Sequence, residues 1–231
     1  MFYLGDPTFV LLLPAILLSL YAQFKVQSTF EYYSHIASHR GLTGAEVARS
    51  LLDRAGLHYV RLEMVRGFLT DHYDPRGRVL RLSPPVYQSN SLAALGVAAH
   101  ETGHALQHRT GYLPLRLRSA LVPVVSLGSN LAIPLLLLGL VFGLPSLARL
   151  GVYAFMLAVV FTLITLPVEF NASRRALALL ESGGYLTGQE LVGARQVLNA
   201  AALTYVAAAL TAVLNLIRLM LLAGFFGRRD E

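Results

Sequence analysis

Four long apolar runs determine what this chain can fold into. Each is close to the roughly 20 residues that an α-helix needs to cross the hydrocarbon core of a bilayer. The composition agrees, because 55% of the 231 residues are hydrophobic, 14% are charged and the mean hydropathy is +0.56. These values indicate an integral membrane protein and not a soluble domain. The runs cover residues 8–24, 121–142, 150–168 and 200–223.

The distribution of basic residues favours one orientation in the membrane. Of 19 Lys and Arg residues, twelve lie in segment 25–120, whereas the short turn 143–149 holds one. The positive-inside rule therefore places this segment and segment 169–199 in the cytoplasm. A multi-pass protein of the inner (plasma) membrane is expected. The basic pair Arg228 and Arg229 falls outside in this arrangement and conflicts with the rule.

The expected fold class is mainly α: a polytopic membrane protein of about four transmembrane helices with a small α+β cytoplasmic lobe. The first run is interpreted as a retained anchor, because residues 1–7 contain Asp6, no Lys and no Arg, unlike a signal peptide. The expected segments are an anchor (1–24), the lobe (25–120, with a motif helix at 91–109), a transmembrane hairpin (121–168), cytoplasmic helices (169–199), and a final transmembrane helix and tail (200–231).

Within the lobe, short patterns predict a helix and a small sheet. Thr43-Gly44-Ala45-Glu46 is a capping box, and the helix that follows it is expected to stop at Gly56. Residues 59–65 and 79–82 are strand candidates, and Asp74-Pro75-Arg76-Gly77 has the order of a type I turn. A small hairpin or edge strand is expected. Its edge could hold an extended peptide by main-chain pairing, or the hairpin could be purely structural.

The motif that carries chemistry is His100-Glu101-Thr102-Gly103-His104, within the buried helix expected at 91–109. One helical turn separates the two histidines, so both can bind the same tetrahedral Zn²⁺. Glu101 is placed to deprotonate the zinc-bound water. The chain contains no cysteine, so a zinc site must use His and carboxylate ligands. Core histidines satisfied by carbonyl groups are the plain structural alternative.

A catalytic zinc site takes three protein ligands, so a third donor is needed. His108 follows His104 by four residues, but one straight helix would splay three ligands too widely to meet at one ion. Glu169 is the better candidate, because it sits where the third apolar run ends and a polar helix begins, and a carboxylate there needs a partner. Its alternative role is a salt bridge to Arg174 or Arg175.

Two stretches give the chain a specific resemblance. H-E-T-G-H-A-L-Q at 100–107 and L-P-V-E-F-N-A-S-R-R-A at 166–176 resemble the YugP-like family of bacterial membrane zinc metallopeptidases. Residues 70–75 and 201–206 are similar to the same family, so the resemblance covers nearly the whole chain. The wider group includes the HtpX-like membrane peptidases, in which the glutamate of an E-x-x-x-D pattern is the third ligand. Here that pattern reads Glu169 to Ser173.

The resemblance implies a gluzincin-like site, with one zinc ion held by His100, His104 and Glu169 and with Glu101 as the catalytic base. Ser173, which replaces the aspartate of the wider group, could still hydrogen-bond a histidine or Glu169. The residue that stabilises the oxyanion stays open. Donors with the right chemistry are Tyr205, His72, Tyr87 and Arg174.

These observations predict a zinc endopeptidase that cuts membrane-associated or misfolded proteins at the cytoplasmic face by Glu-assisted attack of zinc-bound water. Two alternatives remain: a zinc-stabilised, non-catalytic membrane scaffold, which would have no use for Glu101, and a transporter, which would need carboxylates within the spans. The expected partners are the bilayer and protein or peptide substrates. The basic residues suit anionic head groups and not nucleic acid. A homo-oligomer or a scaffold partner is left open.

Overall fold

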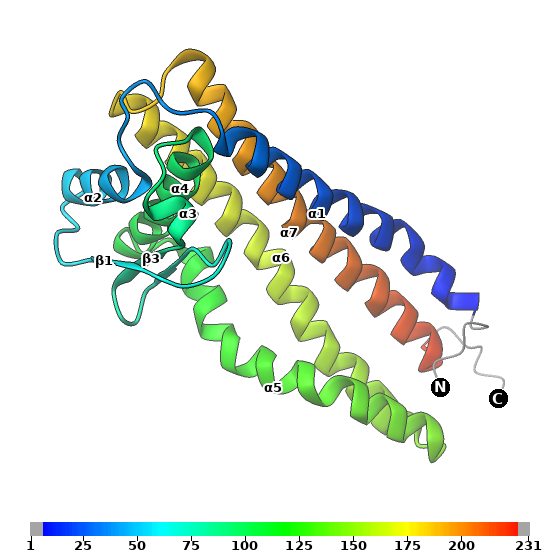
Figure 1. Cartoon of the computed structure of the whole chain (residues 1–231). Coiled ribbons are helices and arrows are strands. Elements are labelled where there is room, and N and C mark those ends of the chain that lie inside the picture. Colours follow the sequence, from blue (N-terminus) through cyan, green and yellow to red (C-terminus); the bar gives the residue numbers. More distant parts are fainter. Residues whose placement is uncertain (1–6, 226–231) are drawn as a thin grey trace. The chain divides into compact units, whose positions relative to one another are not determined.

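The computed structural model describes residues 7–225 and is mainly helical, as expected (Figure 1). Within residues 7–225, four helical segments are long and apolar enough to cross a membrane. The expected fold class, a mainly α protein with four apolar spans and a small lobe that contains a sheet, is therefore confirmed, while the cytoplasmic position of that lobe stays a prediction. Residues 1–6 of the expected anchor, and Arg228 with Arg229, lie outside the described residues. The long helices are α1 (Leu13–Ser34, preceded by the 3₁₀ turn Pro7–Leu12), α5 (Leu113–Val141), α6 (Pro145–Ser182) and α7 (Gly188–Leu222).

The chain forms two compact units. Among the described residues, the first contains 7–21, Leu117–Leu166 and 204–225. The second contains Ala22–Arg116 and Pro167–Leu203, so it includes the polar lobe, the His-Glu-x-x-His motif and Glu169. Every residue of the candidate metal centre belongs to this second unit. The five-segment division expected from the sequence stays a prediction.

In the first unit, α5 and α6 form a hairpin whose backbones approach closely at glycines. A Cβ atom added to Gly151 would lie 2.6 Å from the carbonyl oxygen of Ala132, a separation that real Cβ atoms do not adopt. Gly139 has the same restriction against the backbone of Ala148. Small residues allow this approach, which is how helices pack in a membrane where lipid tails are as apolar as leucine.

Helix α6 corrects one expectation. A break was expected near Pro167, between the third apolar run and a separate polar helix, but α6 is continuous from Pro145 to Ser182. Proline removes one backbone hydrogen bond, and membrane helices tolerate the loss where neighbouring groups compensate. The continuity places Glu169 inside a long helix and not at the start of a new one.

The lobe sheet has three strands, β1 (Arg61–Met64), β2 (His72–Asp74) and β3 (Val79–Leu82), in the order β1-β3-β2. The hairpin expected from residues 59–65 and 79–82 is wrong, because β1 and β3 pair in parallel. The hairpin is instead formed by β2 and β3, which pair antiparallel. The expected turn joins these two strands, where Asp74 Oδ1 accepts hydrogen bonds from the backbone N–H groups of Arg76 (2.9 Å) and Gly77 (3.1 Å).

Three further helices complete the lobe: α2 (Gly44–Arg54), α3 (Pro84–Tyr87) and α4 (Leu92–Arg109). The capping box that starts α2 is present in both directions between Thr43 and Glu46. Helix α4 packs against α2 and α3, and its first two turns are buried. Leu82, Val86 and Ala98 are fully buried in the core that joins the sheet to α4. The first half of α4, which precedes the histidines, is therefore packed into the core of the lobe.

Candidate metal centre

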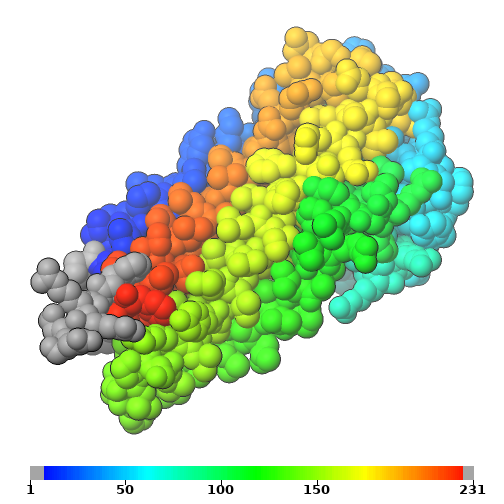
Figure 2. All heavy atoms as spheres, turned by 180° about the vertical axis from the view of Figure 1, so that it is seen from behind, coloured from blue at the N-terminus to red at the C-terminus, as the bar shows by residue number. Residues whose placement is uncertain are grey.

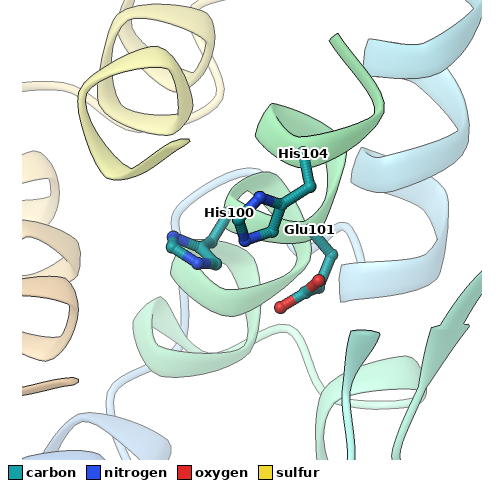
Figure 3. A group of neighbouring side chains, drawn as sticks. All are labelled: His100, Glu101 and His104. Atoms are coloured by element: carbon teal, nitrogen blue, oxygen red, sulfur yellow. The ribbon is translucent and has the colours of Figure 1, made fainter. Parts of the chain in front are cut away.

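Helix α4 carries the two histidines and Glu101 (Figure 3). Its N-terminus is capped by Ser91, whose hydroxyl accepts a hydrogen bond from the backbone N–H of Ala94 (3.2 Å). One helical turn separates His100 from His104, so both rings project from one face, with side chains 13% and 12% exposed. Glu101 is buried, and one ligand atom from each of the three side chains lies within 4.8 Å of the others.

Glu169 of α6 meets both histidines. Its Oε2 atom lies 3.2 Å from His100 Nε2 and 3.4 Å from His104 Nε2, and its side chain is 4% exposed. Two atoms bound to one tetrahedral zinc ion at about 2.0–2.1 Å are about 3.3 Å apart. The donor set and its spacing therefore fit Zn²⁺. A carboxylate oxygen of Glu101 lies within 4.8 Å of a ring nitrogen of each histidine, a separation that one water molecule can bridge.

The close approach of α4 and α6 depends on Gly103, the second free position of the motif. A Cβ atom at this position would lie 2.7 Å from the backbone carbonyl oxygen of Ala172 in α6. Glycine avoids this collision because it has no side chain. Figure 2 shows from behind the last turns of α6, in yellow, packed beside the green residues around the end of α4. This contact brings Glu169 to the histidines.

Each histidine has a neutral hydrogen-bond partner on its other ring nitrogen. His100 Nδ1 lies 3.1 Å from Ser173 Oγ, and His104 Nδ1 lies 3.0 Å from Gln107 Oε1. An amide oxygen can only accept, so His104 donates its Nδ1 proton to Gln107, which would leave the Nε2 lone pair for a metal ion. The hydroxyl of Ser173 can accept from His100 in the same way. Such partners fix the orientation and tautomer of metal-binding histidines.

Gln107 links the motif helix to the segment around Glu169. Its side chain is fully buried, and its Nε2 atom donates to the backbone oxygen of Val168 (2.7 Å) and to Asn171 Oδ1 (3.1 Å). Because both neighbours of Nε2 are oxygen acceptors, the side-chain amide of Gln107 must point its NH₂ group toward α6 and its oxygen toward His104. Arg175 Nε also donates to Asn171 Oδ1 (2.8 Å). Sequence reasoning missed Gln107, although a polar residue one turn after His104 in an apolar helix was the available signal.

The negative charges around His104 oppose the effect of burial on its pKa. Burial alone would lower the pKa of His104, but the hydrogen bond with Glu169 and the negative charges of Glu101 and Glu169 outweigh it. The pKa of His104 therefore lies above its ordinary value. The same negative potential favours a divalent cation at these nitrogens.

The remaining sequence candidates have other surroundings. His108 Nδ1 lies 2.9 Å from the hydroxyl of Tyr73 in β2, and His108 is exposed. His72 is exposed, and its Nδ1–H donates a hydrogen bond to the backbone oxygen of Thr70 (2.8 Å). Tyr87 is half-buried in α3 and packs against the lobe core. Arg174 is exposed on α6, and Tyr205 belongs to the first compact unit.

The fold and the site define a class: a multi-span helical protein in which a His-Glu-x-x-His helix and a glutamate from a long apolar helix form a candidate metal centre. The chain belongs to the family described as "Putative neutral zinc metallopeptidase", which matches residues 8–224. It is also similar to "Putative membrane protease YugP" of Bacillus subtilis (strain 168), with 51% identity over 221 residues, covering 96% of this chain and 97% of that protein. No solved structure matches this chain.

Proposed function

We propose that this protein is a membrane-embedded, zinc-dependent endopeptidase that binds one Zn²⁺ per chain through His100, His104 and Glu169. The observation that carries the proposal is the convergence of Glu169 Oε2 on the two Nε2 atoms, at 3.2 and 3.4 Å, beside a buried Glu101. Membership of a zinc metallopeptidase family supports the same reading. A structural zinc site would close its fourth position and would have no role for a buried base.

The side chains divide the reaction between them. Zn²⁺ bound at these three atoms supplies a Lewis acid for the scissile carbonyl and the attacking water. Glu101 accepts a proton from that water and delivers it to the amide nitrogen as the C–N bond breaks, which gives a new carboxyl group and a free amine. His104 donates its Nδ1 proton to Gln107, and Ser173 can accept the Nδ1 proton of His100, so both histidines can bind the metal through Nε2 and neither acts as the base.

An edge strand that contacts the motif helix is suited to hold the substrate. β2 lies at an edge of the sheet and contacts α4, and Tyr73 of β2 reaches His108 one turn beyond His104. An extended peptide that paired with this edge would run past the motif helix. The substrates we propose are membrane-associated or misfolded proteins, because such chains present extended segments. The positive-inside rule supports a site at the cytoplasmic face of the inner membrane.

The test is cleavage of an unstructured protein by the full chain purified in detergent, with and without a zinc chelator. Glu101→Gln should abolish cleavage and keep one zinc per chain, because the substitution removes the base and leaves the three ligands. Glu31→Gln is the matched control, since Glu31 is exposed on α1 and pairs with His35. It should cut as the wild type does.

Two other results would change the assignment. If wild type and Glu101→Gln both hold zinc and neither cleaves, the protein is a zinc-stabilised membrane scaffold. If Glu101→Gln cleaves at the wild-type rate, another group is the base. Replacing Glu169 by Gln should lower zinc content, which separates ligand from base.

A further inference from the structure

The connection between β1 and β2 exposes large apolar side chains. Phe68 is 57% exposed and Leu69 is 37% exposed, and Met64 at the end of β1 is 53% exposed. The backbone turns sharply here, with φ of +119° at Gly67 and +54° at Leu69. A leucine in the left-handed region is uncommon. The loop therefore presents two adjacent exposed apolar side chains at its tip, close to the exposed Met64.

The loop packs against the end of a membrane span. The ring of Phe68 meets the ring of Phe30 edge to face, with centroids 5.5 Å apart. Phe30 belongs to the span Thr8–Ser34, which has 27 residues. At 1.5 Å per residue this helix is about 40 Å long, whereas the hydrocarbon core is about 30 Å thick. The last turns of α1, with Phe30, therefore reach the head-group layer, and the loop lies beside them.

The charges near the loop match a lipid surface. Arg66 is exposed in the loop, and Lys25 is exposed on α1 just after the most apolar part of the span. The acidic residues nearby already have partners: Asp71, at the end of the loop, accepts hydrogen bonds from the backbone N–H (2.7 Å) and the hydroxyl of Ser83, and Glu31 on α1 pairs with His35 at 2.9 Å. A basic residue beside exposed Phe and Leu is typical of segments that lie at the boundary between head groups and acyl chains.

We propose that residues 65–71 form a membrane-contacting loop, in which Phe68 and Leu69 enter the interfacial layer of the bilayer and Arg66 contacts lipid phosphates. Continuity with α1 is what selects lipid as the occupant. The loop adds a second attachment of the lobe to the bilayer, beyond the spans themselves. The inference is independent of the zinc chemistry, so it stands or falls separately from the proposed peptidase activity.

Fluorescence tests the loop directly, because the chain contains no tryptophan. Phe68→Trp and Leu69→Trp each introduce a single tryptophan into the full chain, which is reconstituted in phosphatidylcholine vesicles and excited at wavelengths that its tyrosines do not absorb. Bromine atoms on the lipid tails quench a tryptophan that lies near them. We expect Trp at these positions to emit at shorter wavelength and to lose most of its emission, more with bromine at carbons near the head group than with bromine deeper in the tails.

Two control variants bracket the result. Phe24→Trp, 69% exposed on the span, should be quenched by the lipids. Tyr59→Trp, 54% exposed on the same lobe, precedes β1, and this strand of four residues separates it from the loop by about 13 Å. It should not be quenched.

The outcomes decide the proposal. Quenching at position 68 or 69, with Tyr59→Trp unquenched, supports it. If Phe68→Trp and Leu69→Trp both behave like Tyr59→Trp while Phe24→Trp is quenched, the loop faces water and the proposal is overturned. A blue shift in that case on adding an unfolded protein would assign the apolar tip to substrate binding instead. Two positions are used because Phe68 packs on Phe30, and its replacement alone could disturb the loop.

Discussion

Replacing Gln107 by Met should weaken zinc binding although Gln107 is not itself a ligand. Methionine has a similar length and flexibility, so the fully buried position stays filled, but it makes none of the three hydrogen bonds to His104, Val168 and Asn171. His104 would then lose the acceptor that fixes its tautomer. Loss of such a partner typically costs about 10- to 100-fold in metal affinity, or about 1.4–2.8 kcal/mol.

The same substitution should also lower the stability of the zinc-free protein. Three hydrogen bonds at roughly 1 kcal/mol each give a loss of about 3 kcal/mol, with Asn171 still held by Arg175. Zinc affinity is measured by competition with a chelator whose absorbance reports free zinc, and stability by thermal unfolding with and without zinc. In Gln107→Met the thermal midpoint without zinc should be lower than in the wild type. In addition, the rise in midpoint on adding zinc should be smaller than in the wild type.

Two further variants make the reasoning refutable. Gln196→Met alters an exposed glutamine of α7 in the same unit and should bind zinc as the wild type does. Asn171→Ala removes one partner of Gln107 but leaves the bond to His104, so its loss of affinity should be smaller. A Gln107→Met protein with wild-type zinc affinity would show that the tautomer of His104 does not depend on Gln107.

Three other predictions follow from close contacts and from one cap. Gly103→Ala should reduce zinc content, measured by metal analysis, because the new methyl collides with a carbonyl oxygen of α6 and separates Glu169 from the histidines. Gly151→Ala should destabilise the α5–α6 hairpin by about 1–3 kcal/mol, measured by unfolding in mixed micelles. Hydrogen bonds from Thr43 hold the pKa of the Glu46 carboxyl below its ordinary value. This stabilisation is present above the unfolded pKa and is lost as pH falls through the folded pKa. Thr43→Ala keeps the backbone N–H bond to Glu46, the larger cause, but removes the side-chain bonds, so it should lower the thermal midpoint at neutral pH and make that midpoint fall less in acid.

The sequence predicted the elements that depend on local spacing. The capping box at Thr43, the helix around His100 and the four apolar spans each rest on residues close together in the chain, and the structure has all of them. Glu169 was reached by a physical argument about a carboxylate at a span end together with the resemblance. The structure brings it to both histidines, while its role as a ligand stays a prediction.

What the sequence did not reveal depends on contacts between distant residues. β2 has only three residues, too few for a clear alternating pattern, and the parallel pairing of β1 with β3 follows from the path of the chain between them. Pro167 was interpreted as a helix end because proline loses a backbone hydrogen bond, but neighbouring packing decides whether the helix continues. Gln107 needed the structure for a similar reason, since its partners in α6 are more than sixty residues away.

The neutral partners of the two histidines would set the charge balance of the candidate metal centre. With Ser173 and Gln107 uncharged, the two positive charges of Zn²⁺ would be balanced by the ionised carboxylates of Glu169 and Glu101, and the sum is zero. Glu101→Gln removes one negative charge and leaves the centre with one excess positive charge in a mostly buried site. That variant should therefore bind anionic compounds, such as a peptide with a free carboxylate, more tightly than the wild type does, which makes it a practical trap for product-like ligands.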